Sequence, residues 1–308
     1  MRTRLSASLA ALAIIAMGAF VAGCGDDNDD NGTTSASTEL TATPDIEQTK
    51  DDAIASQVPQ EIASKGTLTV AADATYPPDE FIAEDGKTVI GMDADMANAI
   101  AQLMGLQPSI QNVTFDAILP GLEAGKYDLG MSSFTDTKER EATVDFVTYL
   151  TAGSSIYTKA DGGPDATSLD ALCGLKVAAE RGTTQSDQID EQTKKCTGEG
   201  KEAITPVILP DQNGVNTALS AGRADAAMAD SPVASYIVEK SNGQFKVTGG
   251  PFPPEPYGIA IPKDNGMAQP VQAAIQALID NGTYDKILEY WDLQDGAIDT
   301  PGINGAVS

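Results

Sequence analysis

The sequence of 308 residues contains no histidine, and its 19 lysines and arginines stand against 45 aspartates and glutamates. Binding of nucleic-acid phosphates requires clustered basic side chains, so these few, scattered cations argue against a nucleic-acid partner. Without histidine the chain lacks the side chain most often used for acid–base catalysis and a common zinc ligand, and its cysteines form no C-x-x-C pair. We therefore expect neither a metal nor a cofactor.

No apolar run in the sequence is long enough for a transmembrane helix. The first one, residues 9–22, follows two arginines and is too short and wrongly flanked to span a bilayer, so residues 1–23 are predicted to be an export signal. The tetrapeptide VAGC at 21–24 resembles the lipobox of bacterial lipoproteins, which implies cleavage before Cys24 and a diacylglycerol on its sulfur. An ordinary signal peptide with an unrelated cysteine is the alternative.

Residues 24–55 contain little that could form a core. They carry nine acidic residues against one lysine, among many serines and threonines. Such a segment cannot bury enough apolar surface to offset its ordering entropy, so we expect a disordered tether. With a lipid on Cys24, this tether holds the rest of the chain in the cell envelope, at the outer face of the cytoplasmic membrane on its periplasmic or extracellular side.

Export also bears on the two remaining cysteines, Cys173 and Cys196. They form an even pair in an oxidising compartment, which favours a disulfide. A disulfide closing a loop of this length contributes roughly 3 kcal/mol in the chain-entropy model. Two free buried thiols are the alternative.

From Gly66 onward, strand and helix patterns alternate, as in an α/β protein. Residues 66–73 form a short β-branched run, and the apolar residues from Met92 to Leu103 recur at helical spacing until Gly105. Further helices are predicted at 269–280 and 283–291, with Gly282 between them. The apolar residues of the last helix are expected in the core: Tyr284, Ile287, Leu288 and Trp291.

One unit occurs twice in this alternation. LEAGKYDLGM at 122–131 and LSAGRADAAM at 219–228 both fit L-x-A-G-[KR]-x-D-x-x-M. In each copy an apolar helix ends at a glycine, a turn carries the cation and the aspartate, and a buried strand follows. The predicted helices are 118–124 and 215–221, and the predicted strands are 129–131 and 226–228. The repeat indicates two α/β units of one design.

Three segments follow predicted strands, where ligands bind in open parallel sheets. They are 132–140, 229–232 and the turn within 176–187, which leads into a helix whose first N–H groups attract anions. A proline-rich segment, 251–262, follows the second unit.

Five segments together resemble the amino-acid-binding branch of the bacterial extracellular solute-binding proteins (family 3), the receptor subunits of ABC importers. They are ADATYPPDEF (72–81), GMDADMANAI (91–100), residues 113–146, ERGTTQ (180–185) and GRADAAMADSP (222–232), and the resemblance covers about residues 60–295. It implies an α/β, two-lobed periplasmic-binding-protein fold of type II, in which each lobe is a mainly parallel sheet flanked by helices. The first lobe is predicted at 56–154 and 251–308, the second at 155–250, and the two-strand hinge at 155–159 and 249–253.

The resemblance also assigns roles to individual residues. Arg140 corresponds to the arginine that clamps the α-carboxylate of the ligand, for which a planar guanidinium is suited. Asp230 corresponds to the carboxylate that binds the α-ammonium group. The other positions that the resemblance implies are Ser132, Ser133 and Thr135 for the carboxylate and α-amino group, Thr183, Thr184 and Gln185 at a helix start, and Asp73, Tyr76, Phe115 and Glu180 around the ligand side chain.

Each assignment has a structural alternative. Arg140 lies between two glutamates and fits a solvated helix face. Asp230, before Ser-Pro, fits a helix cap, as do Thr183 and Thr184.

The predicted side-chain pocket contains two carboxylates, from Asp73 and Glu180. Burying both without a cation is costly, which favours arginine, lysine or ornithine as ligand, with glutamine next. Asp79 departs from the family because an apolar residue is common there; it either reinforces the preference for a cation or faces water.

The sequence therefore predicts a lipid-anchored, monomeric binding protein that delivers a polar amino acid to an ABC transporter permease and is not an enzyme. Two other functions stay open. A few relatives of this fold dehydrate cyclic acids, so a cyclohexadienyl or arogenate dehydratase is one. A ligand sensor that contacts another receptor is the other.

Overall fold

The computed structural model describes residue 43 and residues 45–307. The predicted signal peptide, Cys24 and most of the predicted tether lie outside these residues. Among the described residues, no helix has the length and apolar character needed to cross a bilayer.

The first sheet has five strands in the order β5-β1-β6-β13-β7. β1 is parallel to both β5 and β6, and β13 is antiparallel to both β6 and β7. The strands are β1 (Thr67–Ala72), β5 (Gln107–Asn112), β6 (Leu129–Gly130), β7 (Val144–Ala152) and β13 (Glu255–Pro262). A small antiparallel sheet contains β2 (Thr75–Tyr76), β3 (Glu80–Ile82) and β4 (Val89–Ile90). We call the elements around these two sheets the first lobe.

The second lobe surrounds a sheet of the same design, in the order β10-β9-β11-β8-β12. Here β9 is parallel to β10 and β11, while β8 is antiparallel to β11 and β12. The strands are β8 (Ser154–Lys159), β9 (Lys176–Glu180), β10 (Thr205–Leu209), β11 (Ala226–Asp230) and β12 (Phe245–Gly249). The fold is therefore mixed α/β, with two related five-stranded sheets, as predicted.

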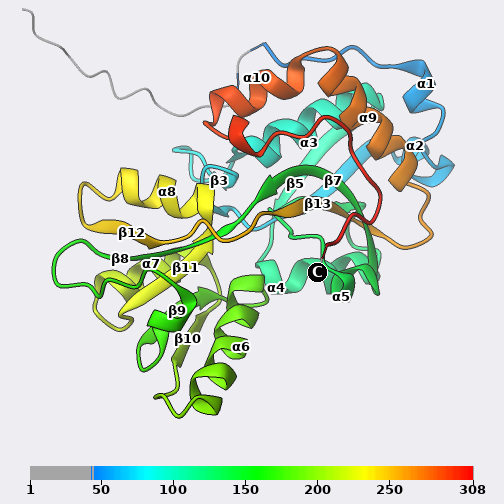
Figure 1. The fold of residues 1–308 in the computed structure, drawn as a ribbon. Coiled ribbons are helices and arrows are strands. Elements are labelled where there is room, and N and C mark those ends of the chain that lie inside the picture. The colour runs from blue at the N-terminus through cyan, green and yellow to red at the C-terminus, as the bar shows by residue number, and fades with distance from the viewer. Residues whose placement is uncertain (1–42, 44, 308) are drawn as a thin grey trace, which may run out of the picture. The chain divides into compact units, whose positions relative to one another are not determined.

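Helices flank both sheets and bury their apolar faces on them (Figure 1). In the first lobe these are α1 (Asp52–Ala55), α2 (Gln60–Lys65), α3 (Met92–Leu103), α4 (Phe115–Glu123), α5 (Lys138–Glu141), α9 (Ala268–Asp280), α10 (Thr283–Tyr290) and the 3₁₀ turn η2 (Gln294–Gly296). In the second lobe they are η1 (Leu169–Leu172), α6 (Thr184–Gly198), α7 (Gln212–Ser220) and α8 (Ser231–Lys240).

The C-terminal helices complete the core of the first lobe, beside α3, which lies far away in sequence (Figure 1). All four residues predicted to be core are buried in one cluster: Tyr284, Ile287, Leu288 and Trp291. The indole Nε1 of Trp291 donates a hydrogen bond to Asp95 Oδ2 on α3 at 2.9 Å, so its polar atom is satisfied inside the core.

The repeated unit has the same local structure in both lobes. Gly125 and Gly222 end their helices at φ 68° and 69°, a left-handed conformation that glycine adopts without a steric penalty. The repeated aspartate then binds the neighbouring strand. Asp128 Oδ2 accepts from the backbone N–H of Thr69 at 2.7 Å, and Asp225 Oδ2 accepts from that of Lys176 at 2.8 Å.

The chain crosses between the two sheets twice. The first crossing is at Gly153, between β7 and β8, so the predicted hinge segment 155–159 lies instead within β8 of the second sheet. The second crossing is at 250–254. The two crossings touch, because a Cβ on Gly153 would lie 2.0 Å from the carbonyl oxygen of Phe252. A residue other than glycine therefore cannot be accommodated at 153 without a backbone shift.

Two predictions outside the sheets have different outcomes. Cys173 and Cys196 form a disulfide with their Cα atoms 5.7 Å apart. The predicted tether, by contrast, extends too far, because residues 45–55 pack against the first lobe. The Asp51 N–H donates to the carbonyl of Leu103 at 2.9 Å, and α1 begins at the next residue. Composition alone missed these contacts, because they join the segment to residues far along the chain.

Candidate functional site

One cavity of about 10 Å³ is lined by residues of both lobes. This volume is about that needed for one water molecule, so the lining side chains lie close together. All twelve residues predicted to bind a ligand line it, and Glu80 is a thirteenth. They are Asp73, Tyr76, Phe115, Ser132, Ser133, Thr135, Arg140, Glu180, Thr183, Thr184, Gln185 and Asp230. That they contact a ligand stays a prediction, which the geometry of the cavity supports.

Arg140 extends from α5 across the aromatic floor of the cavity. Its Cζ lies 5.5 Å from the centroid of Phe115 and 5.4 Å from that of Phe134, and these rings stack at 4.4 Å. Nη1 donates to the Thr135 carbonyl at 2.8 Å and Nη2 to the Gly182 carbonyl at 2.9 Å. Two of five N–H donors are thus used on main chain, and the rest suit a carboxylate. The side chain does not extend along a solvated helix face.

Asp230 lies at the end of β11, where α8 begins, but its side chain does not cap that helix. Its Oδ2 accepts from the Tyr76 hydroxyl at 3.0 Å and its Oδ1 from Gln185 Nε2 at 2.8 Å. Tyr76 belongs to the first lobe and Asp230 to the second, so this hydrogen bond joins the lobes. Burial raises the pKa of Asp230 to about 6.

The helix start beyond β9 combines a structural role with exposure to the cavity. Thr183 caps α6, because its Oγ1 accepts from the N–H of Ser186 at 3.2 Å, and the hydroxyl also donates to the Glu180 carbonyl at 2.8 Å. Thr184 Oγ1 lies 3.5 Å from Thr135 Oγ1 of the first lobe. The cap predicted as an alternative is therefore present at Thr183, which also lines the cavity.

Asp73 and Glu180 form the acidic end of the cavity, and both are buried. The Asp73 carboxylate accepts from the Thr75 hydroxyl at 2.8 Å and the Phe115 N–H at 2.9 Å. Glu180 Oε1 is buried without a hydrogen-bond partner among the described residues. Burial and the nearby Asp73 raise the pKa of Glu180 to about 10. Glu180 is therefore protonated at neutral pH in the absence of a cation.

The sequence did not assign Glu80 to the site, although it stands next to Asp79 in YPPDEF. Glu80 Oε1 accepts a hydrogen bond from Ser132 Oγ at 2.7 Å. Asp79 is fully buried, which rules out the alternative that it faces water. The only available signal was two adjacent acids between apolar residues, and the structure buries both of them.

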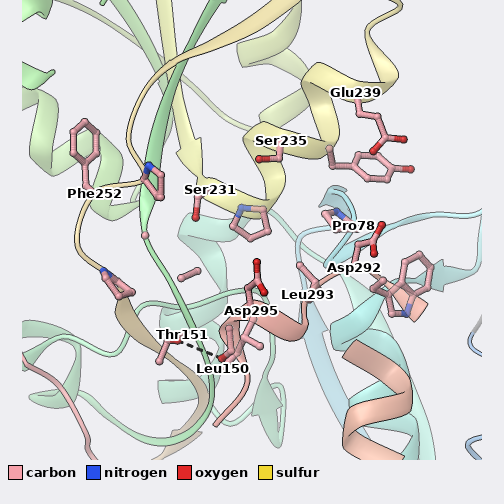
Figure 2. A pocket seen from close by; sticks show the side chains of 18 of the residues that line it. Pro78, Leu150, Thr151, Ser231, Ser235, Glu239, Phe252, Asp292, Leu293 and Asp295 are labelled. Atoms are coloured by element: carbon pink, nitrogen blue, oxygen red, sulfur yellow. Dashed lines mark hydrogen bonds between the residues drawn. The ribbon is translucent and has the colours of Figure 1, made fainter. Parts of the chain in front are cut away.

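A second cavity is larger, about 680 Å³, and lies beside the crossings between the sheets. Figure 2 shows it lined by Ser231 and Ser235 of α8, by Pro78 and by Leu293 and Asp295 after α10. It contains none of the predicted site residues. Of the described residues, none that lines it has a buried side-chain polar atom without a partner. By size alone this cavity would be the candidate ligand site. The smaller cavity is the better candidate, because it contains a buried polar atom without a hydrogen-bond partner among the described residues.

Among the described residues, no group of three or more cysteine, aspartate or glutamate side chains is placed so that it could hold a metal ion.

Comparisons with known proteins agree with the two-lobed α/β fold. The model of the bacterial extracellular solute-binding proteins, family 3, matches residues 68–294. The arginine-binding protein ArgT of Corynebacterium glutamicum is 38% identical over 252 residues, 82% of each chain. The chain thus belongs to family 3 of the bacterial extracellular solute-binding proteins.

Two solved structures bear on the finer assignment. An ancestral arginine-binding protein bound to arginine superposes with a TM-score of 0.67 at 36% identity, covering 73% of this chain and 98% of that one. The ancestral amino acid-binding protein AncCDT-1, a precursor of cyclohexadienyl dehydratase, gives 0.68 at 34% identity, covering 75% and 97%. Both are amino-acid-binding proteins, and the second is a precursor of an enzyme.

Proposed function

We propose that this protein is the substrate-binding receptor of an ABC importer and captures a free amino acid between its two lobes. A lipid on Cys24 anchors it at the outer face of the cytoplasmic membrane, and as a monomer it hands its ligand to a permease. It acts by binding and release and catalyses no reaction.

The observation that carries this proposal is the pair Arg140 and Asp230 on one cavity. They come from different lobes and have opposite charge. An α-amino acid carries a carboxylate and an ammonium group on one carbon, so a single ligand can satisfy both side chains. Occupancy then favours the arrangement in which the lobes lie together, because only that arrangement binds both groups at once.

The acidic end of the cavity favours a cationic side chain. Glu180 Oε1 has no hydrogen-bond donor among the described residues, and an acceptor in this state is costly. A guanidinium or ammonium group supplies both the donor and the charge that allows Glu180 to ionise. We therefore rank arginine, lysine and ornithine above glutamine, which can satisfy the same atom only through a neutral amide.

Calorimetry of the purified, ligand-stripped protein against the twenty amino acids and ornithine tests this function. We expect the tightest binding for a cationic amino acid, with proton release at neutral pH as Glu180 ionises. Binding of apolar amino acids with equal affinity would contradict the assignment of the acidic end.

The variant Glu180→Gln isolates the charge at this end. Since hydrogen bonds to charged groups contribute about 1.5–3 kcal/mol, we expect arginine affinity to fall by roughly 10- to 100-fold and glutamine affinity to change little. Glu202→Gln, an exposed position of the same lobe, is the matched control and should leave both affinities unchanged.

A second candidate is a dehydratase activity, favoured by the similarity to AncCDT-1 and by a carboxyl at 180 that holds its proton at neutral pH. Such a group is a potential general acid. Turnover of prephenate or arogenate by the purified protein, lost in Glu180→Gln, would support this candidate over a receptor that only binds.

A further inference from the structure

Three carboxyl groups lie against Ser132 and Ser133 at the cavity wall. Asp79, Glu80 and Asp93 are almost completely buried, with at most 1% of each residue exposed. None of the ion pairs formed by the described residues includes them. The family function uses the two serines but gives no reason for this concentration of buried acid behind them.

The hydrogen bonds tie the Ser133 hydroxyl to Asp79. Ser133 Oγ donates to Asp79 Oδ2 at 2.8 Å, with Glu80 Oε2 farther away at 3.3 Å. The Ser133 N–H donates to Asp93 Oδ2 at 2.9 Å. This bond holds the backbone at φ 49°, a conformation uncommon outside glycine and asparagine. The other oxygen of Asp79, Oδ1, is buried and has no partner among the described residues.

A serine hydroxyl has one proton to donate. While the Ser133 hydroxyl donates that proton to an ionised Asp79, Ser133 can offer the cavity only lone pairs, which suit an ammonium group. If Asp79 carries a proton of its own, its O–H can donate to Ser133 Oγ. The serine proton is then free for a ligand carboxylate.

We propose that Asp79 is a positioning residue whose protonation decides whether Ser133 donates or accepts a hydrogen bond in the cavity, and that ligand affinity is therefore linked to pH through Asp79. The proposal rests on the proposed amino-acid receptor. In the protonated form of Asp79, Ser133 donates to the ligand carboxylate.

The surroundings favour this protonated form. The groups that face Asp79 are Glu80 on its own strand segment, Asp93 on α3, Tyr149 on β7, Tyr257 on β13 and Asp230 across the cavity. None of them is a cation. Burial, followed by the charge on Asp93, raises the pKa of Asp79 well above its ordinary value.

The variant Asp79→Asn tests the proposal, because the asparagine amide donates to Ser133 at every pH. We measure L-arginine and L-glutamine affinities by calorimetry between pH 6 and pH 9. Below the Asp79 titration we expect parent and variant to agree within about twofold. As the pH rises through that titration, the parent should come to bind both ligands roughly tenfold more weakly than the variant, about 1.4 kcal/mol. Identical pH profiles for parent and variant overturn the proposal.

Asp95→Asn is the matched control. Asp95, on α3, is another buried carboxyl whose pKa burial raises, but it accepts a hydrogen bond from Trp291 and none from Ser132 or Ser133. This variant should keep the pH profile of the parent. Asp95 thus reports what a buried acid without a bond to the cavity serines contributes.

Carbon-13 NMR of the side-chain carboxyls in the ligand-free parent provides a readout that needs no ligand. We expect the Asp79 resonance, assigned by its loss in Asp79→Asn, to titrate well above the range of an ordinary aspartate. Titration near pH 4 overturns the proposal, even if amino acids bind. Failure of every amino acid to bind, with Asp79 titrating high, contradicts the proposed function instead.

Discussion

The two copies of the repeated helix–turn–strand unit share their backbone and differ in the residues that come after the strand. The positions they share serve the fold: a left-handed glycine ends each helix, and an aspartate binds the next strand through a backbone N–H. The positions that differ line the cavity. After β6 come Ser132, Ser133 and Thr135, whereas β11 ends in Asp230. The comparison teaches that the repeat is scaffold and that function lies in the few residues beyond it.

The two strand ends also differ in charge. The first leads through neutral hydroxyls to Arg140, and the second presents a carboxylate. Each is fixed by the opposite lobe, since Arg140 donates to Gly182 and Asp230 accepts from Tyr76. We therefore expect a ligand with separate anionic and cationic groups to contact one strand end with each group.

Removing the cation of the first end has the largest expected effect. In Arg140→Ala, a ligand carboxylate is left buried without its charged donors, which costs about 2–5 kcal/mol. Arginine affinity should fall by at least thirtyfold in calorimetry. Agmatine, which is arginine without its carboxylate, should bind the parent weakly and lose much less in the variant.

Arg140→Lys keeps the charge but not the planar fork, and we expect it to recover only part of the affinity. Equal losses for arginine and agmatine in both variants would assign Arg140 a structural role on Phe115 and Phe134 in place of carboxylate recognition.

Removing the anion of the second end should have a smaller effect. Asp230→Asn preserves the shape of the side chain and one acceptor for the Tyr76 hydroxyl. The variant removes only the negative charge that pairs with the ligand ammonium, which is worth about 1.5–3 kcal/mol. We expect arginine affinity to fall by roughly 10- to 100-fold. 5-Guanidinovaleric acid, which lacks the α-ammonium group, serves as the probe that should not discriminate between parent and variant. If it does, the carboxylate acts on the lobes and not on the ligand.

Much of this arrangement could be predicted from sequence because its signals are local. Helix spacing from Met92 to Leu103, the glycine at each helix end and the alternating strands determine most elements. Three segments of the site were identifiable because they follow predicted strands, whereas the roles of individual residues came from the resemblance to the family. The structure then places all of the predicted positions around one cavity.

The misses concern contacts between distant segments. The composition of segment 45–55 is that of an acidic linker, but a backbone hydrogen bond from Asp51 to Leu103 holds it against the first lobe. The first crossing lies at Gly153, where the close approach of the Phe252 carbonyl allows only glycine. No local sequence pattern indicates a contact with a residue this far along the chain. Burial of Asp79 was equally hidden, because its partners Ser133 and Asp93 come from other elements.

The shared aspartates give the smallest expected effect and the sharpest comparison of the two units. Asp128→Ala leaves the partly buried Thr69 N–H without its acceptor and breaks the pair with Lys65 at 2.5 Å. An unsatisfied N–H costs about 1–3 kcal/mol, so the midpoint of thermal unfolding should fall by a few degrees.

In Asp225→Ala the equivalent N–H belongs to Lys176, which is exposed, so water replaces the lost carboxylate and the midpoint should hardly change. Arginine affinity should be unchanged in both variants. If Asp225→Ala is as destabilising as Asp128→Ala, exposure does not determine the contribution of this hydrogen bond, and the repeated aspartate has a role beyond satisfying one backbone donor. If either variant weakens binding, the division between a repeated scaffold and a functional strand end is too strict, because the turn would then position the residues beyond its strand.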